Sequence, residues 1–389
     1  MNPFNYFYFP GRLAWRQLVF DKTKLFAAIC GVLFACVLVF MQLGFKDSLY
    51  NSAASAPLKM NGDLFLMHKQ TEAMWRPTRF NRSELMRTLG HPDVDSAYPM
   101  YLSLAQFKNI ETQTKRTLMV YGYDPDADLL AVEAIIEKRT ELRLKDTALF
   151  DESSRPEFGP MRALLDAGKN STEINDYKLN IIGLFRLGVS FAADGNVMTS
   201  DQNFLRIFAD RRADQIDIGV IKIRPGSDVK KVQADLKTRL NEFVNIFTYD
   251  ELVQYEKSYW ENTAPIGFIF GFGTIMGLVV GMVIVYQILF TDITNHLNEF
   301  ATLKAMGYKH GYFIRVVFAS AFFLAILGFL PGFLMSLGLY RLAESQTFMP
   351  MPMTPHKVFT VFLFILSMCA SAGLLAMRKL KAASPADMF

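Results

Sequence analysis

The chain has 389 residues, of which 51% are hydrophobic, and it carries a formal net charge of only +4. Its mean hydropathy of +0.17 is high for a soluble protein, and the apolar residues are concentrated in blocks. The weak overall charge gives no support to a nucleic-acid-binding protein. Composition therefore favours a membrane protein and argues against a soluble globular enzyme.

Four long stretches contain no Asp, Glu, Lys or Arg. A helix needs roughly 20 residues to cross a hydrocarbon core of ~30 Å, and each stretch reaches that length. Soluble proteins seldom bury helices this long without a charge, so the sequence predicts four transmembrane helices. The charge-free stretches are Leu25–Phe45, Ala264–Thr291, Val316–Tyr340 and Val358–Met377. We place the helices over 25–45, 264–291, 313–340 and 358–377.

Residues 1–24 precede the first predicted span. Two interpretations stay open for them: an amphipathic helix at the membrane interface, or an ordinary basic flank with a tryptophan anchor. The first span is too long for a signal peptide and no convincing cleavage site follows it, so we expect an uncleaved anchor. The residues behind both interpretations are apolar Leu13, Trp15, Leu18 and Val19 beside basic Arg12, Arg16 and Lys22.

Basic residues before the first span and after the fourth determine the predicted orientation. They are Arg12, Arg16, Lys22 and Lys24 at one end, and Arg378, Lys379 and Lys381 at the other. By the positive-inside rule, both termini lie in the cytoplasm, including the tail 378–389. The segment 292–312 is then cytoplasmic as well, whereas 46–263 and the short loop 341–357 lie outside.

The large outside segment, 46–263, has the pattern of a mixed α/β domain. Its predicted strands are Asp63–Met67, Asp95–Tyr101, Arg116–Tyr123, Lys178–Leu187 and Ile216–Arg224. Its predicted helices are Ser83–Leu89, Leu129–Lys138 and Asp228–Phe243. Strand–helix–strand units at both ends flank a middle portion, which predicts a split domain with a second lobe inserted at about 125–205. All three cysteines (Cys30, Cys36 and Cys369) lie in the spans, so this domain has no disulfide.

The second span has a regular pattern of small residues. They are Gly267, Gly271, Gly273, Gly277 and Gly281. In lipid, small residues at four-residue spacing allow close helix–helix approach, so we expect this span to pack along another helix. The third span contains Pro331 between Gly328 and Gly332, which is compatible with a hinge or with a static kink.

The segment between spans two and three has the periodicity of an amphipathic helix. Its apolar positions recur at intervals of three and four, and Gly307 occupies the place of a helix C-cap. The apolar positions are Ile293, Leu297, Phe300, Leu303 and Met306, and the polar ones are His296, Asn298, Glu299, Thr302 and Lys304. We interpret the segment as a helix that docks into a partner; the alternative is a solvated connector.

Sequence motifs for catalysis are missing. The chain has no Gly-x4-Gly-Lys-Ser/Thr loop, no His-Glu-x2-His, no cysteine pair at metal spacing and no Gly-x-Ser-x-Gly elbow. The charge-free stretches also lack the ionisable residues that gradient-driven transporters usually need. We therefore expect no enzymatic activity, no cofactor and no metal site in this chain.

The segment between spans two and three also resembles a known protein family in its sequence. Residues 298–307 (NEFATLKAMG), together with one anchor, a large outside domain and three further spans, resemble permeases of the MacB/FtsX/LolC type. These permeases form the mechanotransmitting branch of ABC transporters. Blocks elsewhere resemble the cyanobacterial DevC family in particular. They are 40–45 (FMQLGF), 154–159 (SRPEFG), 193–196 (ADGN), 203–208 (NFLRIF), 265–270 (PIGFIF), 283–289 (VIVYQIL) and 385–389 (PADMF).

The resemblance implies a homodimeric permease subunit of a tripartite exporter in a bacterial inner membrane, with a MacB-like periplasmic domain. Its partners would be a separate DevA-like ATPase, a DevB-like periplasmic adaptor and, indirectly, a TolC-like outer-membrane channel. The cargo would be lipid-like or a glycolipid. An FtsX-like regulator that activates an envelope enzyme without transport is the alternative. The residues implied to contact the ATPase are Glu299, Phe300, Leu303, Lys304, Met306 and Gly307.

Overall fold

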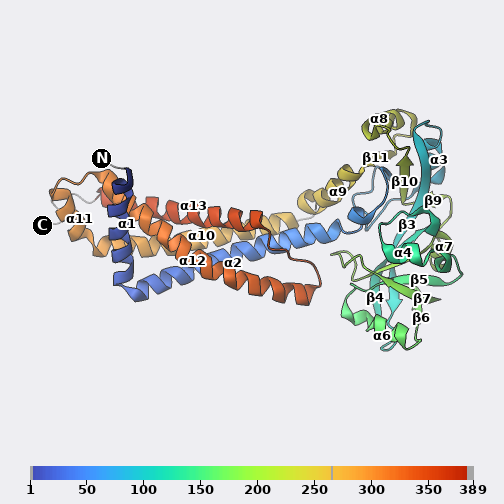
Figure 1. Cartoon of the computed structure of the whole chain (residues 1–389), viewed down its shortest axis with the longest axis horizontal. Helices are drawn as coiled ribbons and strands as arrows, with labels where there is room; N and C mark the ends of the chain where they lie inside the picture. The colour runs from blue at the N-terminus through green and yellow to red at the C-terminus, as the bar shows by residue number, and fades with distance from the viewer. Residues whose placement is uncertain (1–2, 264–265, 383–389) are drawn as a thin grey trace. The chain divides into compact units, whose positions relative to one another are not determined.

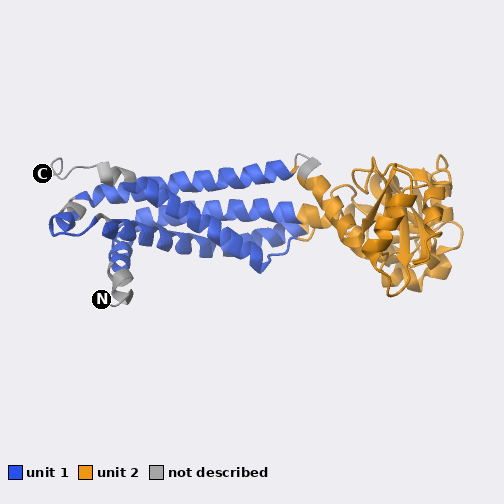
Figure 2. Cartoon of the chain, turned by 90° about the horizontal axis from the view of Figure 1, so that it is seen from above, with its two compact units in different colours: residues 1–47, 267–344, 351–389 blue, residues 48–266, 345–350 orange. Residues whose placement is uncertain are grey.

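The computed structural model describes residues 3–263 and 266–382. The chain divides into a helical unit (1–47, 267–344 and 351–389) and an α/β unit (48–266 and 345–350), coloured separately in Figure 2. Four helices of this chain are long and apolar enough to cross a membrane, and a large mixed α/β unit accompanies them. The predicted fold class is therefore confirmed.

The helical unit is built from six helices (Figure 1). They are α1 (Pro3–Phe20), α2 (Lys22–Ala53), α10 (Ile266–Asn295), α11 (Leu297–Ala305), α12 (His310–Thr347) and α13 (Pro355–Ala382). The candidate membrane spans are α2, α10, α12 and α13. Each helix extends past the apolar stretch that predicts it. Cys30 and Cys36 lie in α2 and Cys369 lies in α13, all as free thiols.

The third long helix, α12, packs closely against α2. A Cβ atom at Gly328 would lie 2.4 Å from Val32 Cβ, and one at Gly332 would lie 2.9 Å from Cys36 Cβ. The helix continues without interruption through Pro331, which lies between these two glycines. The sequence is compatible with either a hinge or a static kink at Pro331. The structure shows in addition that the glycines on both sides of Pro331 pack closely against α2.

A buried lysine joins three helices where α13 begins. The Nζ of Lys357, whose side chain is only 4% exposed, lies 3.0 Å from Asp47 Oδ2 on α2 and donates to the Pro352 carbonyl at 3.1 Å. It also lies 5.3 Å from the ring centre of Tyr340 on α12, within range of a cation–π interaction. The Tyr340 hydroxyl donates in turn to the carbonyl of Phe40. This role of Lys357 is not predicted from the sequence, because its ion-pair partner Asp47 is remote in the chain.

The α/β unit is organised around one nine-stranded sheet. Its spatial order is β11-β1-β10-β3-β4-β8-β5-β7-β6, and β2 and β9 form a separate pair. The β4–β8 and β5–β7 pairs are parallel and the other pairs are antiparallel. The strands are β1 (Leu64–His68), β2 (Phe80–Asn81), β3 (Val94–Lys108), β4 (Lys115–Tyr123), β5 (Thr147–Asp151), β6 (Ser171–Ile174), β7 (Tyr177–Phe185), β8 (Asn196–Ser200), β9 (Gln215–Ile216), β10 (Ile218–Ile223) and β11 (Val244–Thr248).

Short helices connect and cover these strands. The α-helices are α3 (Arg82–Thr88), α4 (Glu133–Glu137), α5 (Arg139–Leu142), α6 (Met161–Asp166), α7 (Asp201–Ile207), α8 (Val229–Arg239) and α9 (Tyr249–Ser258). Single turns of 3-10 helix occur at Pro57–Lys59, Pro125–Ala127 and Pro156–Phe158, and a π-helical turn, Tyr259–Thr263, follows α9.

The five predicted strands are present as β1, β3, β4, β7 and the β9–β10 segment. The predicted inserted lobe, 125–205, does not build a sheet of its own. Its strands β5–β8 continue the same sheet beyond β4, and β6 pairs in addition with the end of β3 at Phe107 and Lys108. The predicted helix Asp228–Phe243 ends at Arg239, because the chain becomes extended at Leu240 and soon enters β11. Its N-cap is Asp228, whose side chain accepts the N–H of Lys230 and of Lys231.

The sheet separates two hydrophobic cores, and β1 contributes to both. Leu64 and Leu66 belong to one core, whereas Phe65 and Met67 belong to the other. Successive side chains of a strand point to opposite faces, so a strand covered on both faces reads as an unbroken apolar run. Helix α8 supplies Val232 and Leu236 to the first core, and α9 supplies Leu252 to the second.

The carboxyl group of Glu256, on α9, is buried on the side of the sheet that carries the second core. The Glu256 side chain lines a small cavity with Trp75 and Trp260, and one of its oxygens accepts the Met74 N–H at 2.9 Å. Burial raises the pKa of Glu256 to about 7, although the hydrogen bond from Met74 opposes the change. The ordinary value is near 4.5, so ionising Glu256 costs the folded state about 3 kcal/mol.

The α/β unit is accordingly expected to lose stability as the pH rises from about 5 to 8. A carboxyl whose pKa is raised by folding binds its proton more tightly in the folded state, so its contribution is present below the unfolded pKa and lost as pH rises through the folded pKa. Thermal unfolding of the purified chain across this range would measure the effect, with Glu256→Gln as the comparison. A variant with the same pH dependence as wild type would contradict the assignment to Glu256.

Candidate functional site: the α11 segment

The segment between the second and third long helices is divided into two helices. Where the sequence predicts one helix through 292–307, α10 continues to Asn295 and α11 runs only from Leu297 to Ala305. His296 separates them with a non-helical backbone (φ −98°, ψ 14°). Its Nδ1 lies 3.0 Å from the Asp292 carbonyl and 3.5 Å from Asp292 Oδ1. The same carbonyl accepts the backbone N–H of His296 at 3.1 Å, so both the main chain and the side chain of His296 contact the last turn of α10.

The end of α11 is a Schellman motif formed around Gly307. The Gly307 N–H donates to the Lys304 carbonyl at 3.0 Å, and the Tyr308 N–H donates to the Leu303 carbonyl at 3.2 Å. Gly307 has φ of +94°, a left-handed conformation that costs a residue with a Cβ atom free energy. The glycine thus ends the helix at a defined residue and turns the chain toward α12.

The apolar residues of α11 lie on two sides of the segment. Leu297 and Leu303 pack against the core of the helical unit. Met306, which the periodicity places on the same face, is 63% exposed because it follows the last helical residue as the C-cap. Glu299 and Lys304 are also exposed. The result is a helix fixed by two leucines that presents two charges and a methionine to its surroundings.

One residue of the predicted site is only partly described. Phe300 belongs to α11, and its side chain lies outside the described part of the chain. The described side chains of the predicted site are therefore Glu299, Leu303, Lys304 and Met306, with the backbone turn at Gly307.

Helix α1 lies at the same end of the helical unit as α11 and runs across the long helices (Figure 1). Its Ala14, Gln17 and Leu18 are buried, at the spacing of one helix face. Arg12 and Arg16 are exposed. This arrangement fits the amphipathic-helix interpretation of the N-terminal segment. The Phe20 ring, at the end of α1, lies 6.4 Å from the His296 ring, so α1 reaches the junction of α10 and α11.

The glycines of α10 differ in how closely a neighbouring helix packs against them. A Cβ atom at Gly281 would lie 2.5 Å from both Ala35 Cβ and Met368 Sδ, and one at Gly277 would lie 3.3 Å from Leu38 Cβ. At Gly273 it would meet the flexible amide of Gln42 at 2.5 Å. At Gly271 no atom of the described residues comes within 4 Å. Gly267 is half-buried in the first turn.

Helix α2 is therefore the neighbour of α10 along much of its length. Ala35, Leu38 and Gln42 are spaced by three and four residues and form one face of α2. Such a glycine-lined contact brings backbones close together without polar bonds between the helices. As for ions, no group of three His, Cys, Asp or Glu side chains with metal-binding geometry occurs within residues 3–263 and 266–382.

This geometry can be compared with known proteins. Residues 271–385 match the FtsX-like permease C-terminal domain family. The match covers most of α10 and all of α11, α12 and the described part of α13, so the α11 segment lies inside this FtsX-like region. No match to a curated protein was found for the whole sequence.

Solved structures similar to the chain include three domains of bacterial membrane proteins. The periplasmic region of MacB from Actinobacillus actinomycetemcomitans is 13% identical, with a TM-score of 0.34, over 50% of this chain and 92% of that one. The extracellular domain of the noncanonic ABC-type transporter YknZ from Gram-positive bacteria is 9% identical (TM-score 0.32; 48% and 99% covered). A domain of a putative permease from Porphyromonas gingivalis is 13% identical (TM-score 0.31; 49% and 91% covered).

Proposed function

We propose that this chain is the non-catalytic membrane subunit of an ABC-type exporter and that a separate ATPase subunit acts on α11. The observation that carries the proposal is the exposed α11 surface, formed by Glu299, Lys304 and Met306, inside the FtsX-like region. Two partly buried leucines and the Schellman turn at Gly307 hold α11 in one place, which favours an ordered docking surface over a solvated connector.

In the proposed mechanism, ATP-driven closure of two ATPase subunits pushes on α11 in each copy of a homodimer. Helix α11 is joined to α10 through the single residue His296, so displacement of α11 moves α10. Helix α2 lies against α10 and is continuous from Lys22 to Ala53, with its last residues in the α/β unit. It offers an unbroken path by which movement reaches that unit without any chemical step in this chain.

The wider assembly is proposed from the sequence resemblance. Both termini would be cytoplasmic and the α/β unit periplasmic, in a bacterial inner membrane. The DevC-like segments support a periplasmic adaptor, an outer-membrane channel of the TolC type and a lipid-like or glycolipid cargo. The cargo would pass through the periplasmic parts of the assembly and would not cross between the membrane-spanning helices of this chain.

The second candidate is an FtsX-like regulator that activates an envelope enzyme. It is favoured by the match of residues 271–385 to the FtsX-like domain, which both functions would use. The DevC-like segments in the α/β unit favour export over regulation.

Affinity purification of the tagged chain from its native membrane, in mild detergent and with mass spectrometry, tests the proposal. We expect a P-loop ATPase and a periplasmic adaptor to copurify. An ATPase with a cell-wall hydrolase in place of the adaptor would favour the regulator. Recovery without any ATPase, under conditions that preserve other ABC complexes, would refute the role assigned to α11.

A further inference from the structure

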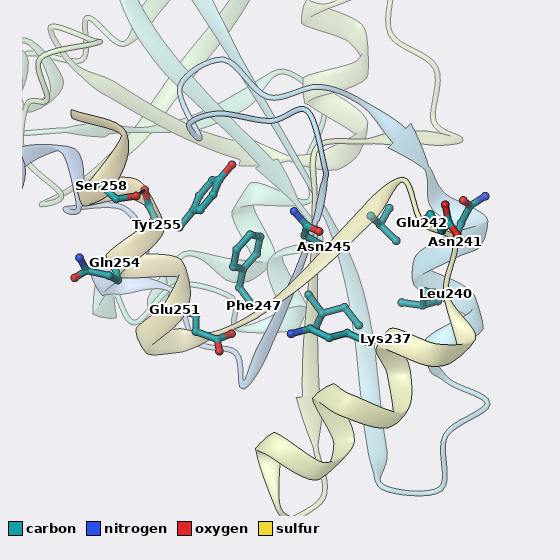
Figure 3. A pocket seen from close by; sticks show the side chains of 12 residues that line it. Lys237, Leu240, Asn241, Glu242, Asn245, Phe247, Glu251, Gln254, Tyr255 and Ser258 are labelled. Carbon is teal, nitrogen blue, oxygen red and sulfur yellow. Dashed lines mark hydrogen bonds between the residues drawn. The ribbon is translucent and has the colours of Figure 1, made fainter. Parts of the chain in front are cut away.

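An open groove lies at one edge of the nine-stranded sheet, between the C-terminal end of α8 and helix α9 (Figure 3). Its volume is about 690 Å³. The floor is strand β11, which forms the edge of the sheet. Lys237 and Leu240 line the α8 side, and Gln254, Tyr255 and Ser258 line the α9 side. Edge strands carry unpaired backbone groups, so the hydrogen bonds of β11 decide what the groove can bind.

The backbone groups of β11 alternate in direction. The Lys69 N–H donates to the Phe243 carbonyl at 2.7 Å, next to the antiparallel β1–β11 pairing. In an antiparallel pair, every second residue bonds to the neighbouring strand and the others point away. Residues 243, 245 and 247 therefore face β1, whereas Val244, Ile246 and Thr248 direct their N–H and C=O groups toward the groove.

Most of the groups that point toward the groove already have partners. The Gln233 side chain donates to the Ile246 carbonyl at 2.9 Å, and the Thr248 N–H donates to Glu251 at 3.0 Å. The Val244 N–H donates to the Asn241 carbonyl at 3.2 Å. The Thr248 carbonyl belongs to the N-cap of α9, where it accepts the first bond of that helix. Of the six groups, two remain without a hydrogen bond to any described residue: the Val244 carbonyl and the Ile246 N–H. They flank Asn245 on the open edge.

We propose that this groove binds an extended polypeptide strand of a partner protein, which adds to the edge of the sheet at Asn245. One acceptor and one donor, separated by one residue, match the N–H and C=O of a single residue in a parallel strand. A lipid tail has neither a donor nor an acceptor to pair with these groups. The bonds made by Gln233, Thr248 and Val244 keep the contact short and prevent a continuous ladder between two copies of the chain.

The walls of the groove indicate which strand fits. Alternate side chains of an extended strand would point toward α8 and toward α9. On the α9 side, Phe247 and Tyr255 pack ring against ring at 4.8 Å and offer an apolar surface. On the α8 side, the positive charge of Lys237 is opposed by the carboxylates of Glu242 and Glu251, which line the same groove. The partner segment therefore places an apolar side chain toward α9. The partner itself rests on the proposed function: it is the periplasmic adaptor of the proposed exporter.

The test uses the full chain with the adaptor that copurifies from the native membrane. Gln254 is exposed on the groove wall, and the α/β unit contains no cysteine, so Gln254→Cys carries a single photo-crosslinker there. Gln254→Trp fills the groove. Thr112→Trp is the control, because Thr112 is exposed and lines a different hollow beside β3 and β4. Hydrogen exchange of the peptide covering 243–248 reports directly on the Ile246 N–H.

We expect the crosslink to form between Gln254→Cys and the adaptor, and exchange in 243–248 to slow when the adaptor is bound. Gln254→Trp should lower adaptor recovery about tenfold, whereas Thr112→Trp leaves it unchanged. If the adaptor binds Gln254→Trp as well as wild type and 243–248 gains no protection, the groove inference is wrong and the proposed function stands. If wild type recovers no adaptor, the exporter proposal fails, and the assignment of the groove to its adaptor fails with it.

Discussion

The double variant Glu299→Lys, Met306→Asp is expected to abolish stimulation of the partner's ATP hydrolysis by this chain. Glu299 is exposed on α11, and Met306 is 63% exposed at its C-cap. The substitutions invert one charge and replace the exposed apolar side chain by another charge. Neither touches the residues that hold α11 in place, Leu297 and Leu303, so membrane insertion and thermal stability should not change. The measurement is the ATPase rate of the reconstituted complex.

A matched control exists at the other end of α12. Leu342 is 58% exposed and Glu344 is exposed, so Leu342→Asp with Glu344→Lys makes the same chemical changes far along the helix from α11. This control should retain stimulated ATP hydrolysis. Wild-type rates in the Glu299→Lys, Met306→Asp variant would show that the ATPase does not act through this surface of α11.

Gly281→Leu is expected to destabilise the helical unit strongly. Even the first added carbon would lie 2.5 Å from Ala35 Cβ and from Met368 Sδ, well inside van der Waals contact. Met368 can rotate away, but Ala35 Cβ is fixed to the backbone of α2, so α10 and α2 must separate. Overpacking of a well-packed core costs about 1–3 kcal/mol, and a leucine in a helix contact falls at the upper end. Thermal unfolding in detergent should show a clearly lower transition temperature.

Gly271→Leu is the corresponding control on the same helix. It makes the same chemical change two to three turns away, at a position where no described atom lies within 4 Å of the added carbon. Its transition temperature should equal or exceed that of wild type, because leucine also favours a helix over glycine. Equal loss in both variants would mean that the close contact of Gly281 with α2 does not determine the stability of α10.

The apolar runs were enough to predict the four membrane-spanning helices, because a stretch of about 20 residues without charges is seldom found outside a membrane span. The strands with high β-propensity, such as those around Leu66 and Val120, were predictable for a similar reason. Helix α9 was missed, although Thr248 and Glu251 form a capping box that the sequence already contains. Strand β5 could not be found by alternation, because all five of its residues are buried.

The α11 segment was predictable in part. Periodicity finds its helix, and Gly307 marks its end. Periodicity fails at Met306, because it assumes that the helix continues past Ala305. Periodicity also fails at the glycines of α10. Gly281 and Gly271 belong to the same regular pattern, yet Gly281 packs against α2 and Gly271 has no described atom close to it. The ion pair of Lys357 with Asp47 joins residues 310 positions apart in the chain (357 − 47), a contact that no local pattern contains.

The two kinds of contact made by α2 allow different movements. Toward α12 and α13, it is held by the ion pair of Asp47 with Lys357 and by the Tyr340 hydroxyl, bonds that break when the helices shift. Toward α10, side chains interlock with it: Ile284 packs at Gly31, and the Phe270 ring stacks on Phe45 at 6.3 Å between ring centres. An interface interlocked in this way resists translation along the helix axis as well as separation. Displacement of α11 would therefore move α10 and α2 together, whereas movement of α2 past α12 and α13 requires the Asp47–Lys357 ion pair to break.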